Sequence, residues 1–220
     1  MGNEYSQISF VIHSTGFLLL LLMAILWPFR KGLSEHTTML FYFFIIVGLI
    51  EGIEPFVVPA GSRSEQGTFF FLLAPLQGFL LMNYLAGKIG ARFQNRLNYL
   101  LIAVISATLT LYATGNSDTA WVFITYFNRL FTAALAIAAL MILVKKSHLL
   151  FFKEDLFWVS LGSAFYSLMY LLFSLLLLTG WYEKGGVSEF DLLADFFKDI
   201  QYGCFLFSVL LREPQREHLP

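Results

Sequence analysis

Charged and polar side chains interrupt the last hydrophobic stretch of the chain, residues 189–211. In a helix with about 100° between successive residues, Asp195, Lys198 and Tyr202 fall on one face, and Asp199 lies beside it. The opposite face carries Leu, Phe and Val. A charge at membrane depth costs about 2.5–3.5 kcal/mol on insertion scales, so such residues mark a functional site by default.

Polar residues on other hydrophobic stretches are expected at a similar depth. His13 lies about five residues into the first stretch and Arg129 about ten into the fifth, while Glu51 comes late in the second, which runs the other way. This distribution predicts one polar pocket open toward the outside. The candidate ligand- or proton-binding residues are His13, Glu51, Glu54, Gln77, Asn128, Arg129, Asp195, Lys198, Asp199 and Tyr202.

The predicted site contains more acid than base, with four carboxylates against Arg129 and Lys198. Full ionisation would leave net negative charge in a medium of low dielectric constant. We therefore expect that a carboxyl group is protonated, that His13 is charged, or that a small polar or cationic ligand binds. The alternative is that Arg129 and Lys198 are structural ion-pair partners that hold the second, fifth and seventh helices together.

The composition indicates an integral membrane protein. Of 220 residues, 58% are hydrophobic and only 13% are charged, whereas soluble domains are roughly 45–50% apolar. The formal net charge of −1 gives no indication of a nucleic-acid partner, and the single Cys204 excludes a disulfide framework within one chain. The lipid bilayer is the expected surrounding of most of the chain.

Seven apolar stretches are long enough to cross a membrane core of about 30 Å as helices. We predict an all-α, seven-transmembrane helix bundle as a single domain over residues 1–211, followed by a short polar cytoplasmic tail at 212–220. The predicted spans are 8–28, 38–58, 68–87, 97–114, 119–144, 155–180 and 189–211.

The distribution of Lys and Arg predicts the orientation. One set of loops and its flanks holds ten Lys and Arg residues and the other set holds only Arg63 and Lys184. The N-terminus is therefore expected outside and the C-terminus in the cytoplasm, as an odd number of spans requires. The sequence predicts a multi-pass protein of a plasma or inner membrane. Its tryptophans, at predicted helix ends, fit an interfacial aromatic belt: Trp27, Trp121, Trp158 and Trp181.

Small residues are spaced for close helix packing. Gly48 and Gly52 lie one turn apart on either side of Glu51, so the second helix is expected to press against a neighbour while presenting its acid. In the fifth stretch an alanine stripe is expected to pack in the same way: Ala133, Ala136 and Ala139. Toward the cytoplasmic side the sequence offers few buried polar groups beyond Asn83 and Ser163.

A lysine in the seventh helix with a carboxylate nearby resembles the rhodopsins. That resemblance implies a Schiff base between Lys198 and retinal, with a carboxylate as counterion. It rests on the topology and on this one residue, because Ala194 stands one turn before Lys198 and the third predicted span has neither Trp nor an acid. Retinal on Lys198 is therefore a subordinate alternative.

No catalytic or metal-binding motif stands out. The sequence lacks His-Glu-x-x-His, Gly-x-Ser-x-Gly, a Walker loop and a cysteine pair, and His13 with two glutamates is not a known metal-ligand pattern. We therefore favour a non-enzymatic receptor or sensor for a small polar or cationic ligand, with a membrane or cytoplasmic protein as output partner. The alternatives are a proton- or cation-coupled small-solute transporter and an accessory subunit of a membrane complex.

Overall fold

The computed structural model describes residues 2–31, 35–57, 63–146, 151–178 and 186–211, and within these ranges the chain is helical. It contains seven α-helices and one short 3-10 helix. In chain order they are α1 (Gly2–Lys31), α2 (Glu35–Val57), α3 (Arg63–Ile89), α4 (Ala91–Ala113), α5 (Ser117–Lys146), η1 (Phe151–Lys153), α6 (Asp155–Leu178) and α7 (Gly186–Leu210). The prediction of seven helices is thus confirmed.

One clear boundary difference is at α4. The sequence predicted a loop up to residue 96, but the helix begins at Ala91, directly after Gly90, where the chain reverses from α3. Arg92 and Arg96 therefore lie in the exposed first turns of α4 and not in a connecting loop. Long charged side chains are tolerated at a helix end because they reach solvent from its surface.

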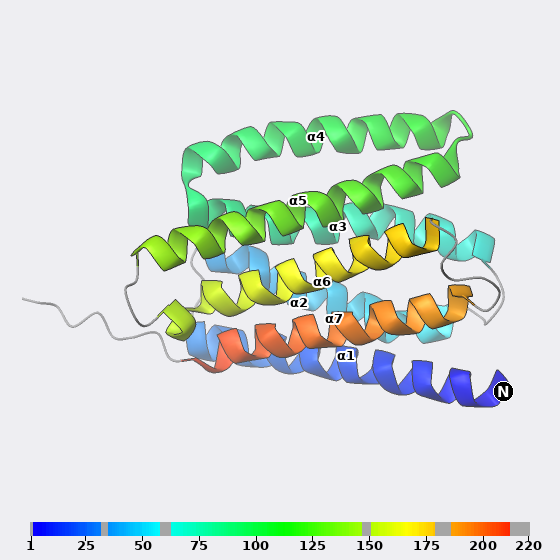
Figure 1. The fold of residues 1–220 in the computed structure, drawn as a ribbon, viewed down its shortest axis with the longest axis horizontal. Coiled ribbons are helices and arrows are strands. Elements are labelled where there is room, and N and C mark those ends of the chain that lie inside the picture. The colour runs from blue at the N-terminus through cyan, green and yellow to red at the C-terminus, as the bar shows by residue number, and fades with distance from the viewer. Residues whose placement is uncertain (1, 32–34, 58–62, 147–150, 179–185, 212–220) are drawn as a thin grey trace, which may run out of the picture.

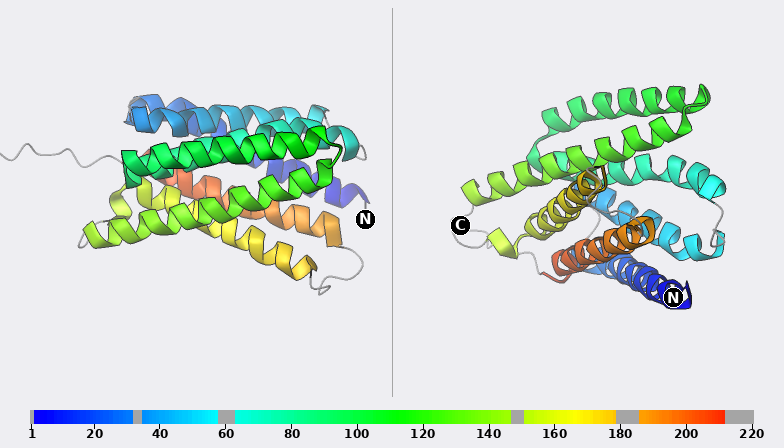
Figure 2. Two further views of the ribbon diagram at one scale, coloured as in Figure 1. Left: turned by 90° about the horizontal axis from the view of Figure 1, so that it is seen from above. Right: turned by 45° about the vertical axis from the view of Figure 1, so that its right-hand side comes forward.

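The helices form a bundle with one peripheral member (Figures 1 and 2). In contact order, α1, α2, α3, α5, α6 and α7 make a closed ring, because α7 packs against both α6 and α1. Helix α4 lies outside this ring and packs on α3 and α5. Residues on the inward sides of α2 and α7 can therefore meet although they are far apart in the sequence.

The core of the ring is apolar and aromatic. Phe44 of α2 lies 5.4 Å, centroid to centroid, from the ring of Trp27 and 6.1 Å from that of Phe205. All three side chains are fully buried. Trp27 therefore belongs to the interior, and its assignment to a lipid-facing aromatic belt was wrong. Trp158 is only partly buried, and the side chains of the other two tryptophans lie outside the described residues.

Glycines set the distance between α1 and α2, as predicted. A Cβ atom added at Gly48 would lie 3.3 Å from the Cβ of Leu20, and one at Gly52 would lie 2.8 Å from the ring of Phe17. The three alanines of the predicted stripe in α5 are also buried. These contacts bring Glu51, between the two glycines, into the interior.

Several helices are suited to lipid. Among the described residues, three helical segments are long and apolar enough to cross a membrane: Ala91–Ala113, Val122–Lys145 and Asp155–Leu176. Two shorter apolar helical segments are Ser14–Phe29 and Thr38–Gly52. Large apolar side chains such as Leu18, Leu130 and Leu175 are mostly exposed, which fits contact with a bilayer. Seven spans and the orientation stay predictions.

Candidate functional site

A charged cluster joins α2 and α7 near the middle of α7. Lys198 Nζ lies 2.9 Å from Glu51 Oε1 and 2.8 Å from Asp195 Oδ1. The hydroxyl of Tyr202 donates a hydrogen bond of 3.1 Å to the same Glu51 oxygen. The spacing of Asp195, Lys198 and Tyr202 along one helix face thus places Lys198 and Tyr202 at the Glu51 carboxylate and Asp195 beside Lys198. We call Glu51, Asp195, Lys198, Asp199 and Tyr202 the acidic cluster.

Helix α1 closes the acidic cluster through a glycine. A Cβ atom at Gly16 would lie 2.9 Å from Asp199 Oδ1 and 3.4 Å from the Tyr202 ring, so only a hydrogen leaves room there. Glu51 and Tyr202 are buried, and Asp199 is half-buried. Three helices therefore enclose these groups in a region where water is scarce.

The ammonium group of Lys198 is shared by two carboxylates, those of Glu51 and Asp195. Glu51 Oε1 accepts from both Lys198 and Tyr202, whereas Glu51 Oε2 is buried and has no hydrogen-bond partner within the described residues. A buried carboxylate oxygen without a hydrogen-bond donor costs free energy. Protonation of this oxygen or contact with a bound cation would remove that cost.

Arg129 lies apart from these carboxylates, against α6. Its Nη2 donates a 3.0 Å hydrogen bond to the Tyr166 hydroxyl, and its guanidinium carbon lies 4.3 Å from the Tyr166 ring centroid and 5.0 Å from that of Tyr170. Neither tyrosine was predicted from the sequence, although their spacing of four residues on the sixth stretch was the available signal. Arg129 therefore tethers α5 to α6, and within the described residues it forms no ion pair with α2 or α7. Lys198 does join α2 to α7, as the structural alternative predicted.

Tyr166 connects Arg129 with the acidic cluster. Helices α6 and α7 pack so that Phe165 and Phe197 are 5.6 Å apart, which puts Tyr166 level with Lys198. The phenol of Tyr166 lies close enough to interact electrostatically with both Lys198 and Tyr202. Tyr166 is thus the buried side chain that contacts Arg129 and lies nearest to it on the side of the acidic cluster.

The remaining predicted residues occupy different positions. Asn128 is buried where α5 meets α3, and a Cβ atom at Gly78 would lie 2.6 Å from its amide. Gln77, the residue before Gly78, is partly buried on α3. His13 and Glu54 belong to α1 and α2, but their side chains lie outside the described residues. The structure thus brings five of the ten predicted residues into direct proximity.

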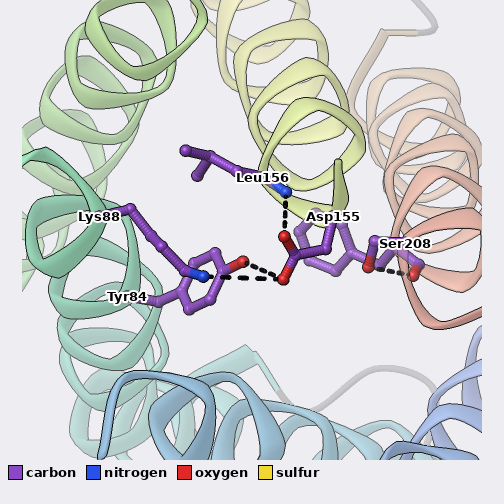
Figure 3. A network of polar contacts seen from close by, with 6 residues as sticks. Tyr84, Lys88, Asp155, Leu156 and Ser208 are labelled. Atoms are coloured by element: carbon purple, nitrogen blue, oxygen red, sulfur yellow. Dashed lines mark hydrogen bonds and ion pairs between the residues drawn. The ribbon is translucent and has the colours of Figure 1, made fainter. Parts of the chain in front are cut away.

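A second buried polar network lies at the end of the bundle where α6 begins (Figure 3). Asp155, the first residue of α6, accepts a 3.2 Å hydrogen bond from Tyr84 and lies 3.8 Å from Lys88 Nζ, both on α3. Its other oxygen accepts a 2.9 Å bond from Leu156 N. Few buried polar groups were predicted on this side, and that prediction was wrong. From the sequence, Lys88 and Asp155 stand at helix boundaries, where charges are ordinarily exposed.

Buried hydroxyls on α6 lie between the two networks. Ser160, Ser163 and Ser167 are fully buried, and their hydroxyls have no hydrogen-bond partner within the described part of the chain. They occupy positions three and four residues apart, so they share one helix face. This face continues from the level of Lys198 toward Asp155.

No three His, Cys, Asp or Glu side chains within the described ranges are grouped to hold a metal ion. Comparison of the chain with protein-family models, curated proteins and solved structures gave no match. Its function is therefore interpreted from its own geometry.

Proposed function

We propose that this protein is a seven-helix membrane receptor or sensor that binds a small polar or cationic ligand at the acidic cluster. The observation that carries the proposal is the buried Glu51 Oε2, which has no hydrogen-bond partner within the described residues, while Glu51 Oε1 and Asp195 share the ammonium of Lys198. An ammonium ligand would donate a hydrogen bond to Oε2, and a metal cation would coordinate it.

Ligand binding would act on the helices through Lys198. A cation that contacts Glu51 competes with Lys198 for the same carboxylate. The ion pair between Glu51 of α2 and Lys198 of α7 would therefore weaken. Because α7 also packs against α1 and α6, its shift would reach the far end of the bundle. With the N-terminus outside and the C-terminus in the cytoplasm, an output partner would read this shift on the cytoplasmic side.

The test is ligand-induced stabilisation of the purified protein in lipid nanodiscs. Methylammonium, choline and sodium are added separately, and thermal unfolding is recorded. A ligand at 100 times its Kd stabilises by about 2.7 kcal/mol. We expect at least one of these cations to stabilise the wild type and to lose its effect in Glu51→Gln. Glu154→Gln, at an exposed position, is the matched control. Equal stabilisation of Glu51→Gln, or none for any cation, would refute the proposal.

A proton- or cation-coupled carrier is the second candidate. It gains support from the polar groups that extend from the acidic cluster along the Ser160, Ser163 and Ser167 face toward Asp155. Vesicles with an imposed pH gradient would show proton or solute flux that Glu51→Gln abolishes. Tight vesicles without flux would exclude the carrier and leave the sensor.

Two further alternatives are an accessory subunit and a retinal-binding protein. Mass spectrometry of protein extracted gently from its own membranes would test both. A partner retained at fixed stoichiometry would favour an accessory subunit. An added mass that survives denaturation and is lost in Lys198→Ala would favour retinal as a Schiff base, with Glu51 and Asp195 placed as counterions.

A further inference from the structure

Exposed basic side chains gather at the end of the bundle where α4 and α6 begin. Arg92 and Arg96 lie in the first two turns of α4. Lys145 lies in the last turn of α5, and Lys153 is the last residue of η1. All four side chains are exposed, and within the described residues none of them forms an ion pair with an acid. Figure 1 shows the start of α4 and the end of α5 at the same end of the bundle.

Acidic side chains do not balance this charge. Those that the structure describes at this end are Glu154 and Asp155, and Asp155 already pairs with Lys88 at 3.8 Å. Four exposed cations therefore stand against one exposed carboxylate. The first turn of α4 has no acidic residue, and no side chain caps its N-terminus. Acids are favoured at this position because the helix dipole is positive there, so the two arginines add to an existing positive potential.

Arg92 and Arg96 share the outward face of α4. The face packed against the bundle is marked by the buried residues Leu97, Leu101 and Val104. At about 100° per residue, both arginines fall on the side away from it. They are one helical turn apart, which puts their Cβ atoms about 5–6 Å from each other. Two guanidinium groups at this spacing can donate hydrogen bonds to the oxygens of one phosphate.

Aromatic and apolar side chains continue this surface beyond the arginines. Tyr99, one turn after Arg96, is 76% exposed, and tyrosine is enriched where a membrane meets water. Farther along α4, Leu100, Ile102 and Leu109 are between 40% and 60% exposed. A phospholipid has the same order of parts, with an anionic phosphate, a polar glycerol and then acyl chains. A soluble anion would match the arginines alone.

We propose that the outward face of α4 binds an anionic phospholipid, with its phosphate at Arg92 and Arg96 and its acyl chains along the apolar side chains of the same helix. Lys145 and Lys153 strengthen the attraction through their charge. The cations lie at the end predicted to be cytoplasmic, and the cytoplasmic leaflet carries anionic lipids. This surface lies outside the ring, so the inference does not depend on the ligand of the acidic cluster.

The experiment is native mass spectrometry of the full chain in detergent micelles, titrated with one lipid at a time. Phosphatidylglycerol and phosphatidylcholine with the same acyl chains differ in headgroup charge, and glycerol 3-phosphate supplies a phosphate without acyl chains. Each basic side chain near an anionic surface strengthens binding about five-fold. We expect phosphatidylglycerol to bind at least ten-fold more tightly than either phosphatidylcholine or glycerol 3-phosphate.

Variants of the two arginines test the site. In Arg92→Gln/Arg96→Gln, the preference for phosphatidylglycerol should fall at least five-fold. Arg92→Lys/Arg96→Lys keeps both charges and should stay within three-fold of wild type. Thr114→Asp/Asn116→Asp, in the exposed turn at the other end of α4, changes the net charge by the same amount as the glutamine variant and should keep the preference. Thermal unfolding of each variant checks that it is folded.

Three outcomes would overturn the inference. Equal binding of the two lipids, or a preference that survives in Arg92→Gln/Arg96→Gln, would show that the arginines do not select an anionic lipid. If glycerol 3-phosphate binds as tightly as phosphatidylglycerol, the occupant is a soluble anion. If Thr114→Asp/Asn116→Asp reduces the preference as much as the glutamine variant does, net charge is responsible and the outward face of α4 is not the site.

Discussion

Lys198 Nζ lies 2.9 Å from Glu51 Oε1, and this contact joins two helices that are far apart in the sequence. Glu51 reaches the contact because Gly48 and Gly52 hold α2 against α1, and Lys198 reaches it from the middle of α7. Asp195, one turn away on α7, shares the same ammonium at 2.8 Å. If a ligand occupies Glu51, Asp195 therefore remains as a carboxylate partner for Lys198.

Removal of one partner of this ion pair should cost more than removal of both. Breaking a buried pair costs about 3–5 kcal/mol because it leaves an unpaired charge, whereas apolar replacement of both partners is often neutral. We expect Lys198→Met to lose about that much, and Glu51→Gln/Lys198→Met to recover part of it. Denaturant titration in detergent micelles measures the three free energies of unfolding. If the double variant loses as much free energy of unfolding as the two single variants together, Glu51 and Lys198 are not coupled.

Two glycines at the α6–α7 region should respond oppositely to alanine. A Cβ atom at Gly162 would lie 2.8 Å from Cys204 Cβ and 3.0 Å from the backbone oxygen of Gln201, whereas one at Gly203 would have no neighbour within 4 Å. Gly162→Ala should therefore lose about 1–3 kcal/mol through overpacking. Gly203→Ala should gain up to about 1 kcal/mol from helix propensity. Equal thermal stability of the two variants would contradict the packing of these helices.

The Asp155 network should stabilise the end of the bundle opposite the N-terminus. Asp155→Ala removes the acceptor of Tyr84 and Leu156 N and the partner of Lys88. We expect a loss of about 1–3 kcal/mol, since buried donors are left unsatisfied. Asp155→Asn retains a neutral acceptor and should lose less. The exposed neighbour variant Glu154→Ala should stay within about 0.5 kcal/mol of wild type.

Cysteine labelling would test the predicted orientation. In a Cys204→Ser background, Asn116→Cys places a thiol in the exposed turn between α4 and α5, and Lys153→Cys places one at the opposite end. A membrane-impermeant maleimide should label Asn116→Cys in right-side-out vesicles and should leave Lys153→Cys unlabelled. Detergent should make both reactive. The reverse pattern in intact vesicles would invert the topology.

Much of the helical architecture could be predicted because hydrophobic stretches of this length must satisfy their backbone groups internally. The face shared by Asp195, Lys198 and Tyr202 could also be predicted, since it depends only on the rotation per residue within one helix. Close packing of α2 against a neighbouring helix also followed from Gly48 and Gly52, and the structure shows that this neighbour is α1.

The partners across helices depended on the tertiary structure. From its depth along the helix, Arg129 was predicted to lie with the acidic residues. The rotation and packing of α5 instead place its side chain against Tyr166 and Tyr170. Trp27 at a helix end suggested an interface, yet the closed ring buried it against Phe44. Asp155 and Lys88 stand at helix termini in the sequence, and only the meeting of α3 with α6 brings them together as a pair.

The sequence alone thus determined the helices, their apolar character and the polar face of α7, because periodicity and hydropathy are local properties. The tertiary structure decided which charges meet and which stay apart. Such contacts depend on helix rotation and side-chain packing between segments distant in the chain, which no local pattern contains.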